Sequence, residues 1–377
     1  MKILHVITGL NTGGAERALL NILSGGLARS SNSVVLSLQD EGRIGLQIEG
    51  LGVPVYTLGM PGGLPGPKAL KRLFQTVRDI KPDIIQGWMY HGNLAASLAG
   101  WLAPGSPAVS WNVRHSLYDI QAEKPLTRHV IKANSILSRL PQSIIYNSHL
   151  SRSQHEAFGF NRCDASVIPN GFDLNYLVPS QEGGQSIRCE FALPADSIVV
   201  GHVARFHPLK DHASFLRAAV QVAQRRPDVS FLLVGREVSP DNPALEGIIP
   251  FHLQERFTFV GERHDVHRLM QAMDIFCLSS TSEAFPNVLG EAMSTGVPSV
   301  TTDVGDSADI IGDTGVVVPP SSSALLAEGL LSLIGMSAQE RRKLGVSARR
   351  RIKERYSLVA VVRQYEKLYE ELVRREI

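Results

Sequence analysis

Residues 282–293 hold the side chains whose types and spacing are best suited to binding chemistry. An apolar run precedes this segment, and Pro286 is well placed as the first residue of a helix. The first N–H groups of a helix have no partner within it, so those of Asn287, Val288 and Leu289 could hold a phosphate group. We therefore expect an anion at this helix N-terminus.

Two carboxylates, Glu283 and Glu291, lie eight positions apart in the same segment. Glu283 comes just before the helix, where the helix dipole favours a charged carboxylate that could accept hydrogen bonds from sugar hydroxyls. Glu291 lies within the helix and could accept both hydroxyls of a ribose diol. Taken singly, Glu283 could equally well be a helix-capping carboxylate, and Glu291 an exposed helical residue.

The loop at residues 205–211 adds two cations, Arg205 and Lys210, after a strand-like run at residues 198–204. Arg205 could bind phosphate oxygens with its planar fork, Lys210 could act as a point charge, and Asp211 is a plausible N-cap. A departing diphosphate gathers negative charge that some enzymes hold with a metal on an Asp-x-Asp pair. No two aspartates of this sequence lie two positions apart, so we expect cations and helix N-termini to do this without a metal or cofactor.

The N-terminal half offers weaker signals. Gly13 and Gly14 end the first loop and let a backbone approach a ligand closely at the next helix N-terminus. His91 and His115 each follow a strand-like run, at residues 84–87 and 108–112. A single histidine is more often structural, but two at corresponding strand ends favour contact with a sugar.

The elements that must position these residues alternate along the chain. Residues 3–7 and 198–204 each begin a strand–loop–helix unit, and strand-like runs then alternate with helical patterns. Further strand-like runs lie at residues 34–38, 53–58, 143–147, 165–169, 230–234, 257–260, 274–278, 299–302 and 315–318. This alternation predicts an α/β chain with two doubly wound, Rossmann-like domains.

A Pro-, Ser- and Gly-containing stretch at residues 178–186 reads as the linker between the two domains. The predicted domains are therefore residues 1–181 and 182–357. Ligands of such folds bind beyond the carboxyl ends of the strands, so we expect the site in a cleft between facing domains. Backbone near Gly235 and Arg263, after two strands of the second domain, is expected to contact the nucleotide base.

Bulk composition excludes several classes of protein. The 377 residues are 44% apolar and 20% charged, and the net charge of +2 gives no footprint for nucleic acid. The three cysteines fit neither a zinc site nor a disulfide framework, so a cytoplasmic protein is expected. The apolar N-terminus reads as a strand rather than a signal peptide, and no stretch approaches 18 apolar residues.

The C-terminal residues 338–356 and 358–374 read as two helices, of which the first is densely basic with an apolar stripe. A solvated helix face is the first interpretation. Attraction to anionic lipid headgroups at the inner membrane face is the alternative, which would make the protein peripheral on that membrane.

Taken together, these motifs resemble the large GT-B glycosyltransferase family 4. Residues 282–293 (Ser-Glu-Ala-Phe-Pro-Asn-Val-Leu-Gly-Glu-Ala-Met) are similar to its Glu-x7-Glu motif, and residues 205–210 to its Arg-x-x-x-x-Lys clamp. Residues 13–16 resemble its Gly-Gly-x-Glu loop, and residues 168–173 its Pro-Asn-Gly-x-Asp segment. The resemblance extends over nearly the whole chain.

The resemblance implies a metal-independent, hexosyltransferase-type enzyme that retains the anomeric configuration. Arg205 and Lys210 would bind the donor diphosphate, Glu283 the donor sugar and Glu291 the ribose, with His115 beside the transferred sugar. His91 is a looser match on the acceptor side. The family also implies that residues 358–377 pack back on the first domain, and that the acceptor is a saccharide or lipid-linked saccharide in surface polysaccharide synthesis, such as lipopolysaccharide or capsule.

Three alternatives remain open at this point. A nucleotide-sugar epimerase of the same architecture would form product from the donor alone. A dinucleotide-dependent oxidoreductase is disfavoured because the sequence lacks the G-x-G-x-x-G fingerprint. A non-catalytic nucleotide-sugar binding protein would bind the donor without turnover.

Overall fold

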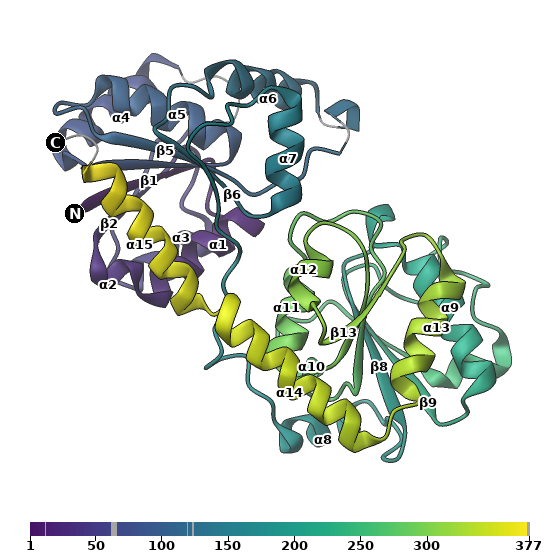
Figure 1. Cartoon of the computed structure of the whole chain (residues 1–377). Coiled ribbons are helices and arrows are strands. Elements are labelled where there is room, and N and C mark those ends of the chain that lie inside the picture. Colours follow the sequence, from purple (N-terminus) through teal and green to yellow (C-terminus); the bar gives the residue numbers. More distant parts are fainter. Residues whose placement is uncertain (12, 62–65, 119, 123, 375–377) are drawn as a thin grey trace. The chain divides into compact units, whose positions relative to one another are not determined.

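The computed structural model describes residues 1–11, 13–61, 66–118, 120–122 and 124–374. The chain divides into two compact units, which are drawn in Figure 1. The first unit comprises Met1–Gly171 and Leu358–Ile377, and the second unit comprises Phe172–Ser357. The chain therefore passes between the units twice.

A seven-stranded parallel sheet in the order β3-β2-β1-β4-β5-β6-β7 forms the centre of the first unit. Its strands are β1 (Lys2–Ile7), β2 (Asn32–Ser37), β3 (Val55–Thr57), β4 (Ile84–Trp88), β5 (Ala108–Val113), β6 (Ser143–Tyr146) and β7 (Ala165–Val167). Its helices are α1 (Gly14–Ile22), η1 (Leu23–Leu27), α2 (Ala28–Ser30), α3 (Gly42–Glu49), α4 (Pro67–Ile80), α5 (Met89–Leu102), η2 (Ile120–Ala122), α6 (Pro125–Leu137), α7 (His149–Phe158) and α15 (Leu358–Arg374).

Alternation along β1 shows how the first sheet is covered on both faces. Ile3 and Ile7 belong to a core cluster with side chains of α1 and α15. Leu4 and Val6 belong to a second cluster with side chains of α4 and α5. Successive side chains of a strand point to opposite faces, so an unbroken apolar strand requires helices on both.

The second unit repeats this plan with a six-stranded parallel sheet in the order β10-β9-β8-β11-β12-β13. Its strands are β8 (Ile198–Val203), β9 (Val229–Val234), β10 (Phe257–Gly261), β11 (Ile275–Leu278), β12 (Ser299–Thr302) and β13 (Gly315–Val318). Its helices are α8 (Gln181–Glu190), η3 (Pro208–Lys210), α9 (His212–Arg225), η4 (Phe251–Arg256), α10 (Val266–Gln271), α11 (Asn287–Ser294), α12 (Ser307–Ile311), α13 (Ser323–Ile334) and α14 (Ala338–Arg355).

The predicted fold class is confirmed: each unit is a doubly wound α/β domain built on a parallel sheet. β12 and β13 begin and end where the sequence pattern placed them, and the other strands differ by one or two residues at their ends. The N-terminal apolar run is β1, in the middle of the first sheet. None of the helices in the described ranges is long and apolar enough to cross a membrane.

The predicted linker at residues 178–186 is wrong, because most of it forms α8. The Ser180 hydroxyl caps this helix by accepting from the N–H of Gly183 at 3.0 Å. A Cβ on Gly184 would lie 2.3 Å from the carbonyl oxygen of Gln271, so this glycine serves a close approach to α10. The passage between units accordingly falls between Gly171 and Phe172 rather than near residue 182.

Three arginines of α14 donate hydrogen bonds to backbone carbonyls of the second unit, whereas the basic pattern predicts a solvated helix face. Arg341 donates to the carbonyl of Ile334 at the end of α13, and Arg349 donates to that of Ser294 at the end of α11. Arg351 donates to the carbonyl of Ile310 at the end of α12. Cations at helix C-termini oppose the negative end of the dipole, so these three arginines stabilise the packing of α14. An exposed set of cations remains on this helix: Arg342, Lys343, Arg350, Lys353 and Arg355.

Candidate active site

The loop after β8 carries the two predicted cations into α9. Its residues 208–210 form the short 3-10 turn η3, and Asp211 follows with a left-handed φ of 47°. The Asp211 carboxylate accepts from the N–H of Ser214 at 3.1 Å, which confirms the predicted N-cap. The guanidinium of Arg205, at the start of the loop, makes no hydrogen bond or ion pair with the residues that the structure describes.

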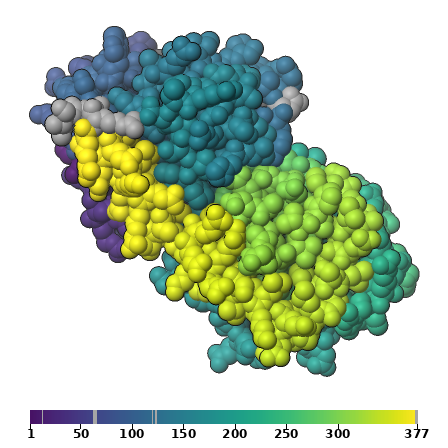
Figure 2. Space-filling view, in the orientation of Figure 1, coloured from purple at the N-terminus to yellow at the C-terminus, as the bar shows by residue number. Residues whose placement is uncertain are grey.

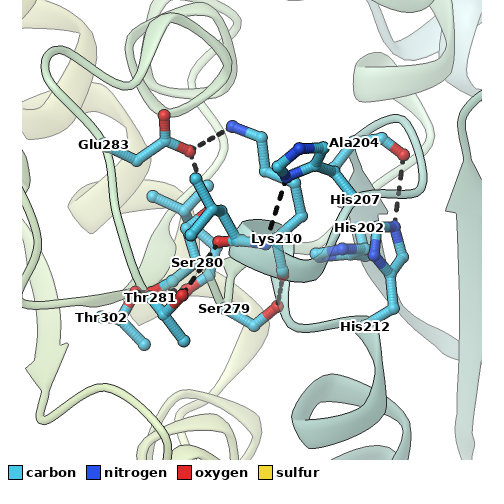
Figure 3. A network of polar contacts seen from close by, with 12 residues as sticks. His202, Ala204, His207, Lys210, His212, Ser279, Ser280, Thr281, Glu283 and Thr302 are labelled. Carbon is cyan, nitrogen blue, oxygen red and sulfur yellow. Dashed lines mark hydrogen bonds and ion pairs between the residues drawn. The ribbon is translucent and has the colours of Figure 1, made fainter. Parts of the chain in front are cut away.

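Lys210 and Glu283 lie side by side at the carboxyl ends of β8 and β11. The Lys210 ammonium is 2.5 Å from Oε1 of Glu283, and the Ser280 hydroxyl donates to the same oxygen at 2.7 Å. Figure 3 shows the lysine reaching across to the carboxylate. The Lys210 side chain is 25% exposed and that of Glu283 only 12%, so the pair is largely shielded from solvent.

Hydrogen bonds between the two loops fix the backbone of this pair (Figure 3). The N–H of Thr281 donates to the carbonyl of Leu209 at 2.8 Å. The Ser279 hydroxyl donates to the carbonyl of Lys210 at 2.8 Å. The Thr302 hydroxyl, on β12, donates to the carbonyl of Ser280 at 2.7 Å. The segments that carry Lys210 and Glu283 are therefore joined by hydrogen bonds to the backbone as well as by the ion pair.

Two buried histidines, His202 and His212, lie next to the loop that carries Lys210. The sequence patterns did not indicate them. His212 lies 3.3 Å from the carbonyl oxygen of Ala204, and His202 lies 3.0 Å from that of Cys277 (Figure 3). Their rings are 4.9 Å apart. Burial lowers the pKa of His202 to about 3 and also lowers the pKa of His212, so both are neutral near pH 7 and add no positive charge beside Lys210.

The start of α11 differs from the prediction by one residue. Pro286 has an extended ψ of 92° and is the N-cap, so Asn287 rather than Pro286 is the first helical residue. The N–H of Leu289 donates to the carbonyl of Pro286 at 3.1 Å, which removes it from the predicted set of phosphate donors. The prediction is wrong here because a proline fixes its own φ but does not oblige its ψ to be helical. Asn287 and Val288 remain at the helix N-terminus, and Glu291 is half-buried in the next turn.

Gly235 directly follows β9, and Arg263 lies two residues after the end of β10. A Cβ on Gly235 would lie 1.8 Å from the carbonyl oxygen of Ala204, so only glycine allows β8 and β9 to end this close together. Arg263 binds Asp265 at 2.8 Å and Glu190 at 3.2 Å. Its guanidinium holds the pKa of Asp265 below the usual value. The side chain of Arg263 is thus occupied by carboxylates, which leaves the backbone of this loop as the part suited to a base.

The predicted residues of the first unit gather at the carboxyl ends of three adjacent strands. Gly13 is the N-cap of α1 after β1, His91 lies in the first turn of α5 after β4, and His115 follows β5. A Cβ on Gly92 would lie 2.6 Å from the carbonyl oxygen of Val6, so α5 begins directly against β1. Gly14 is exposed at the start of α1.

The two histidines of this group differ in their surroundings. Burial lowers the pKa of His91, which favours a neutral imidazole that can donate and accept hydrogen bonds. His115 is half-buried, and its ring meets the edge of Tyr90 with centroids 6.3 Å apart. The structure thus divides the predicted site residues into two groups, one at the strand ends of each unit.

Two protein-family models divide the chain in the same way. The model described as Glycosyltransferase Family 4 matches residues 12–176, and the model described as Glycosyl transferases group 1 matches residues 197–336. This chain is a family 4 glycosyltransferase with the GT-B fold. The family predicted from the motifs is confirmed, and the two matches contain all of the predicted site residues.

Known proteins support this family assignment. The glycosyltransferase is 25% identical over 317 residues to the putative glycosyltransferase EpsF of Bacillus subtilis (strain 168), covering 80% of this chain and 79% of EpsF. It is 30% identical over 141 residues to the UDP-Gal:alpha-D-GlcNAc-diphosphoundecaprenol alpha-1,3-galactosyltransferase of Escherichia coli, covering 37% of this chain and 36% of that protein. The crystal structure of Anabaena Alr3699/HepE in complex with UDP shares the fold with a TM-score of 0.80 and 23% identity, over 98% of this chain and 100% of that one.

Proposed function

We propose that this glycosyltransferase is a retaining hexosyltransferase that moves a sugar from a nucleotide-diphosphate sugar to a saccharide or lipid-linked saccharide. The observation that carries the proposal is the pairing of Lys210 with Glu283 at the N-terminal end of α11. A cation beside a carboxylate suits a donor that presents a diphosphate and sugar hydroxyls at adjacent positions. The Anabaena structure that shares the fold holds UDP, and the relative from Escherichia coli is named for a UDP-sugar donor and a lipid-linked acceptor.

Each part of the donor has a proposed partner in the second unit. Lys210 and Arg205 bind the diphosphate together with the N-terminus of α11, at Asn287 and Val288. Glu283 binds hydroxyls of the donor sugar and Glu291 binds the ribose diol. The backbone near Gly235 and Arg263 binds the base.

The first unit supplies the proposed contacts to the sugars. His115 contacts the transferred sugar, His91 lies on the acceptor side, and Gly13 with Gly14 lets the ligand approach the N-terminus of α1. A neutral imidazole at His91, whose pKa is lowered by burial, suits this task because it can donate to one hydroxyl and accept from another.

Following the family resemblance, we propose that transfer is a front-face displacement. The bond from the anomeric carbon to the phosphate oxygen breaks, the acceptor oxygen forms its bond on the same face, and the acceptor proton passes to a phosphate oxygen. Lys210 and Arg205 hold the charge that collects on the departing diphosphate, without a metal or an organic cofactor.

We further propose a role in cell-surface polysaccharide synthesis at the cytoplasmic face of the inner membrane. A lipid-linked acceptor would bring the enzyme to that surface. The exposed cations of α14 suit a peripheral contact with anionic headgroups, since each basic residue near such a surface adds about 1 kcal/mol.

A panel of UDP-, GDP- and ADP-sugars scored by thermal shift tests the donor class. One nucleotide series is expected to raise the Tm, because a ligand that binds only the folded state stabilises it by about 2.7 kcal/mol at a hundredfold excess over Kd. The matching nucleoside without phosphates is the control and is expected to give no shift. A panel in which no member shifts the Tm would contradict the proposed function.

Glutamine variants separate the roles of the two glutamates. Glu291→Gln is expected to raise the Kd of the donor about tenfold while kcat stays near the wild-type value, because the ribose contact is the same in the ground and transition states. Glu283→Gln is expected to lower kcat about tenfold or more with a smaller change in Kd. Isothermal titration and initial rates measure both, and equal effects of the two substitutions on Kd and on kcat would show that the roles are divided wrongly.

A further inference from the structure

Arg114, the residue before His115, joins the end of β5 to two distant segments of the first unit. Its Nη1 donates to the hydroxyl of Tyr365 at 2.9 Å and to Oδ1 of Asn112 at 3.2 Å. Its Nη2 donates to Oδ1 of Asn170. A planar guanidinium holds several acceptors in fixed directions, so this contact is directional and not merely electrostatic.

The Tyr365 end of this contact is rigid. Tyr365 is fully buried on α15, and its hydroxyl also accepts from Nδ2 of Asn112 at 2.9 Å. Its ring stacks on that of Trp88 with centroids 6.4 Å apart, and the Arg114 guanidinium lies over the same indole at 5.8 Å. Within the first unit, Figure 2 shows the yellow C-terminal segment beside the purple N-terminal one. The C-terminal helix is thus bonded directly to the residue that precedes His115.

The backbone around His115 is held at other points as well. The Ser151 hydroxyl donates to the carbonyl of His115 at 2.6 Å. The N–H of Arg114 donates to the sulfur of Met89 at 3.4 Å, and Met89 itself has a left-handed φ of 61°. A non-glycine residue in that region costs about 1–3 kcal/mol and persists where its surroundings determine it. His115 therefore lies in a segment with little freedom to move.

We propose that Arg114, anchored by Tyr365, is a positioning residue that sets the place of His115 for sugar transfer. The proposal rests on the proposed function of His115. Arg114 directs its guanidinium at Tyr365, Asn112 and Asn170, so it acts on the reaction through the backbone it shares with His115. The C-terminal helix thereby becomes part of the catalytic apparatus of the first unit.

A second tyrosine of α15 provides a matched control. Tyr369 is also fully buried, and its hydroxyl donates to Oε1 of Gln86, on β4, at 3.2 Å. It attaches the same helix to the same sheet, and none of its hydrogen bonds reaches Arg114. Removing either hydroxyl therefore weakens the docking of α15, but only the removal at Tyr365 takes a hydrogen bond from Arg114, the residue beside His115.

The test compares Tyr365→Phe with Tyr369→Phe in the full chain. Both are expected to lower the Tm by a few degrees, and Tyr365→Phe by more, because its hydroxyl accepts two hydrogen bonds and that of Tyr369 makes one. Tyr365→Phe is expected to lower kcat about tenfold, with the donor KM unchanged, whereas Tyr369→Phe stays within about twofold of the wild type, because small misplacements of a catalytic group reduce rates steeply. Arg114→Lys, which keeps the charge and loses the fork, is expected to match or exceed the effect of Tyr365→Phe.

A measurement without substrate keeps this test apart from that of the proposed function. Histidine-selective NMR of the unliganded protein, with the His115 ring signals assigned from His115→Gln, is expected to show them shifted or broadened in Tyr365→Phe and unchanged in Tyr369→Phe. Identical His115 signals in both variants, or equal kcat values, would overturn the role of Arg114 even if the wild type transfers sugar. A wild type that binds no nucleotide sugar while the His115 signals respond as expected would instead contradict the proposed function.

Discussion

Replacing Lys210 with methionine is expected to lower kcat for sugar transfer by roughly 10²- to 10³-fold, the usual loss when a group that stabilises transition-state charge is removed. Methionine preserves most of the length of the side chain and removes the ammonium that lies 2.5 Å from Glu283. The charge on the departing diphosphate would then fall to Arg205 and the N-terminus of α11. The donor Kd is expected to rise less than kcat falls, because the charge is greatest in the transition state.

The same substitution also leaves the Glu283 carboxylate, whose side chain is 12% exposed, without its ammonium. We expect a stability loss of about 1–3 kcal/mol from the partly buried charge, measured as urea unfolding. Adding Glu283→Gln to Lys210→Met is expected to restore part of this stability while leaving activity low. Lys353→Met, an exposed lysine on α14 of the same unit, is the matched control and is expected to change neither quantity in an assay without membranes. A Lys210→Met enzyme with more than about half of the wild-type kcat would show that Lys210 does not stabilise the reaction.

The sequence predicted both members of this pair but not their contact. Lys210 and Glu283 are separated by 73 positions, and each was assigned a different part of the donor. They meet because β8 and β11 are neighbours in the sheet. Successive strands are added on one side of β8 up to β10 and on its other side from β11 onward, so the switch point of the sheet lies between β8 and β11. Alternating apolar runs predict parallel strands, but the order of the strands is a property of the packed domain. A contact between two residues on either side of a switch point, such as that of Lys210 with Glu283, can therefore be found only from the structure.

Predictions from local composition were wrong at residues whose role depends on packing. Gly183 and Gly184 read as flexible linker residues, yet they lie in α8, where a Cβ on Gly184 would collide with the backbone of α10. Arg349 reads as surface charge, yet it donates to the carbonyl of Ser294 at the end of α11. Both patterns are ambiguous in one dimension because glycine serves turns and close contacts alike, and arginine serves solvent and helix ends alike.

The buried histidines and the Arg114 contact were missed for a related reason. His202 lies within an apolar strand and His212 at the start of a helix, so neither stood at the end of a strand where the sequence pattern directed attention. Arg114 adjoins the predicted His115, and its guanidinium donates to Asn112, Tyr365 and Asn170, which no spacing in the sequence indicates. Side chains that act through other residues carry no spacing signal of their own.

Substituting alanine for Gly235 is expected to destabilise the second unit by roughly 3 kcal/mol or more, through backbone strain and a steric collision together. Gly235 has a φ of 158°, and the added Cβ would lie 1.8 Å from the oxygen and 2.6 Å from the carbon of the Ala204 carbonyl. The three atoms nearest to this Cβ, the oxygen and carbon of Ala204 and the nitrogen of Arg205, all belong to the backbone, so no rotation of a side chain relieves the collision. The ends of β8 and β9 must separate instead, at the point where the Arg205 loop begins.

Gly247→Ala isolates the collision from the backbone strain. Gly247 also has a positive φ, 72°, but a Cβ there would meet no atom within 4 Å. This control is expected to cost only about 1 kcal/mol, the usual penalty for a left-handed residue with a side chain. Thermal unfolding of the second unit measures both, with a Tm decrease of roughly 6 °C or more expected for Gly235→Ala.

Donor binding distinguishes a local effect at the loop from general instability. At a temperature where Gly235→Ala remains folded, its affinity for the nucleotide diphosphate that stabilises the wild type is expected to fall at least about tenfold, because the backbone that carries Arg205 and Lys210 has moved. Gly247→Ala is expected to bind as the wild type does. If the two variants lose similar stability and bind equally well, the contact between Gly235 and Ala204 does not set the position of the phosphate-binding loop.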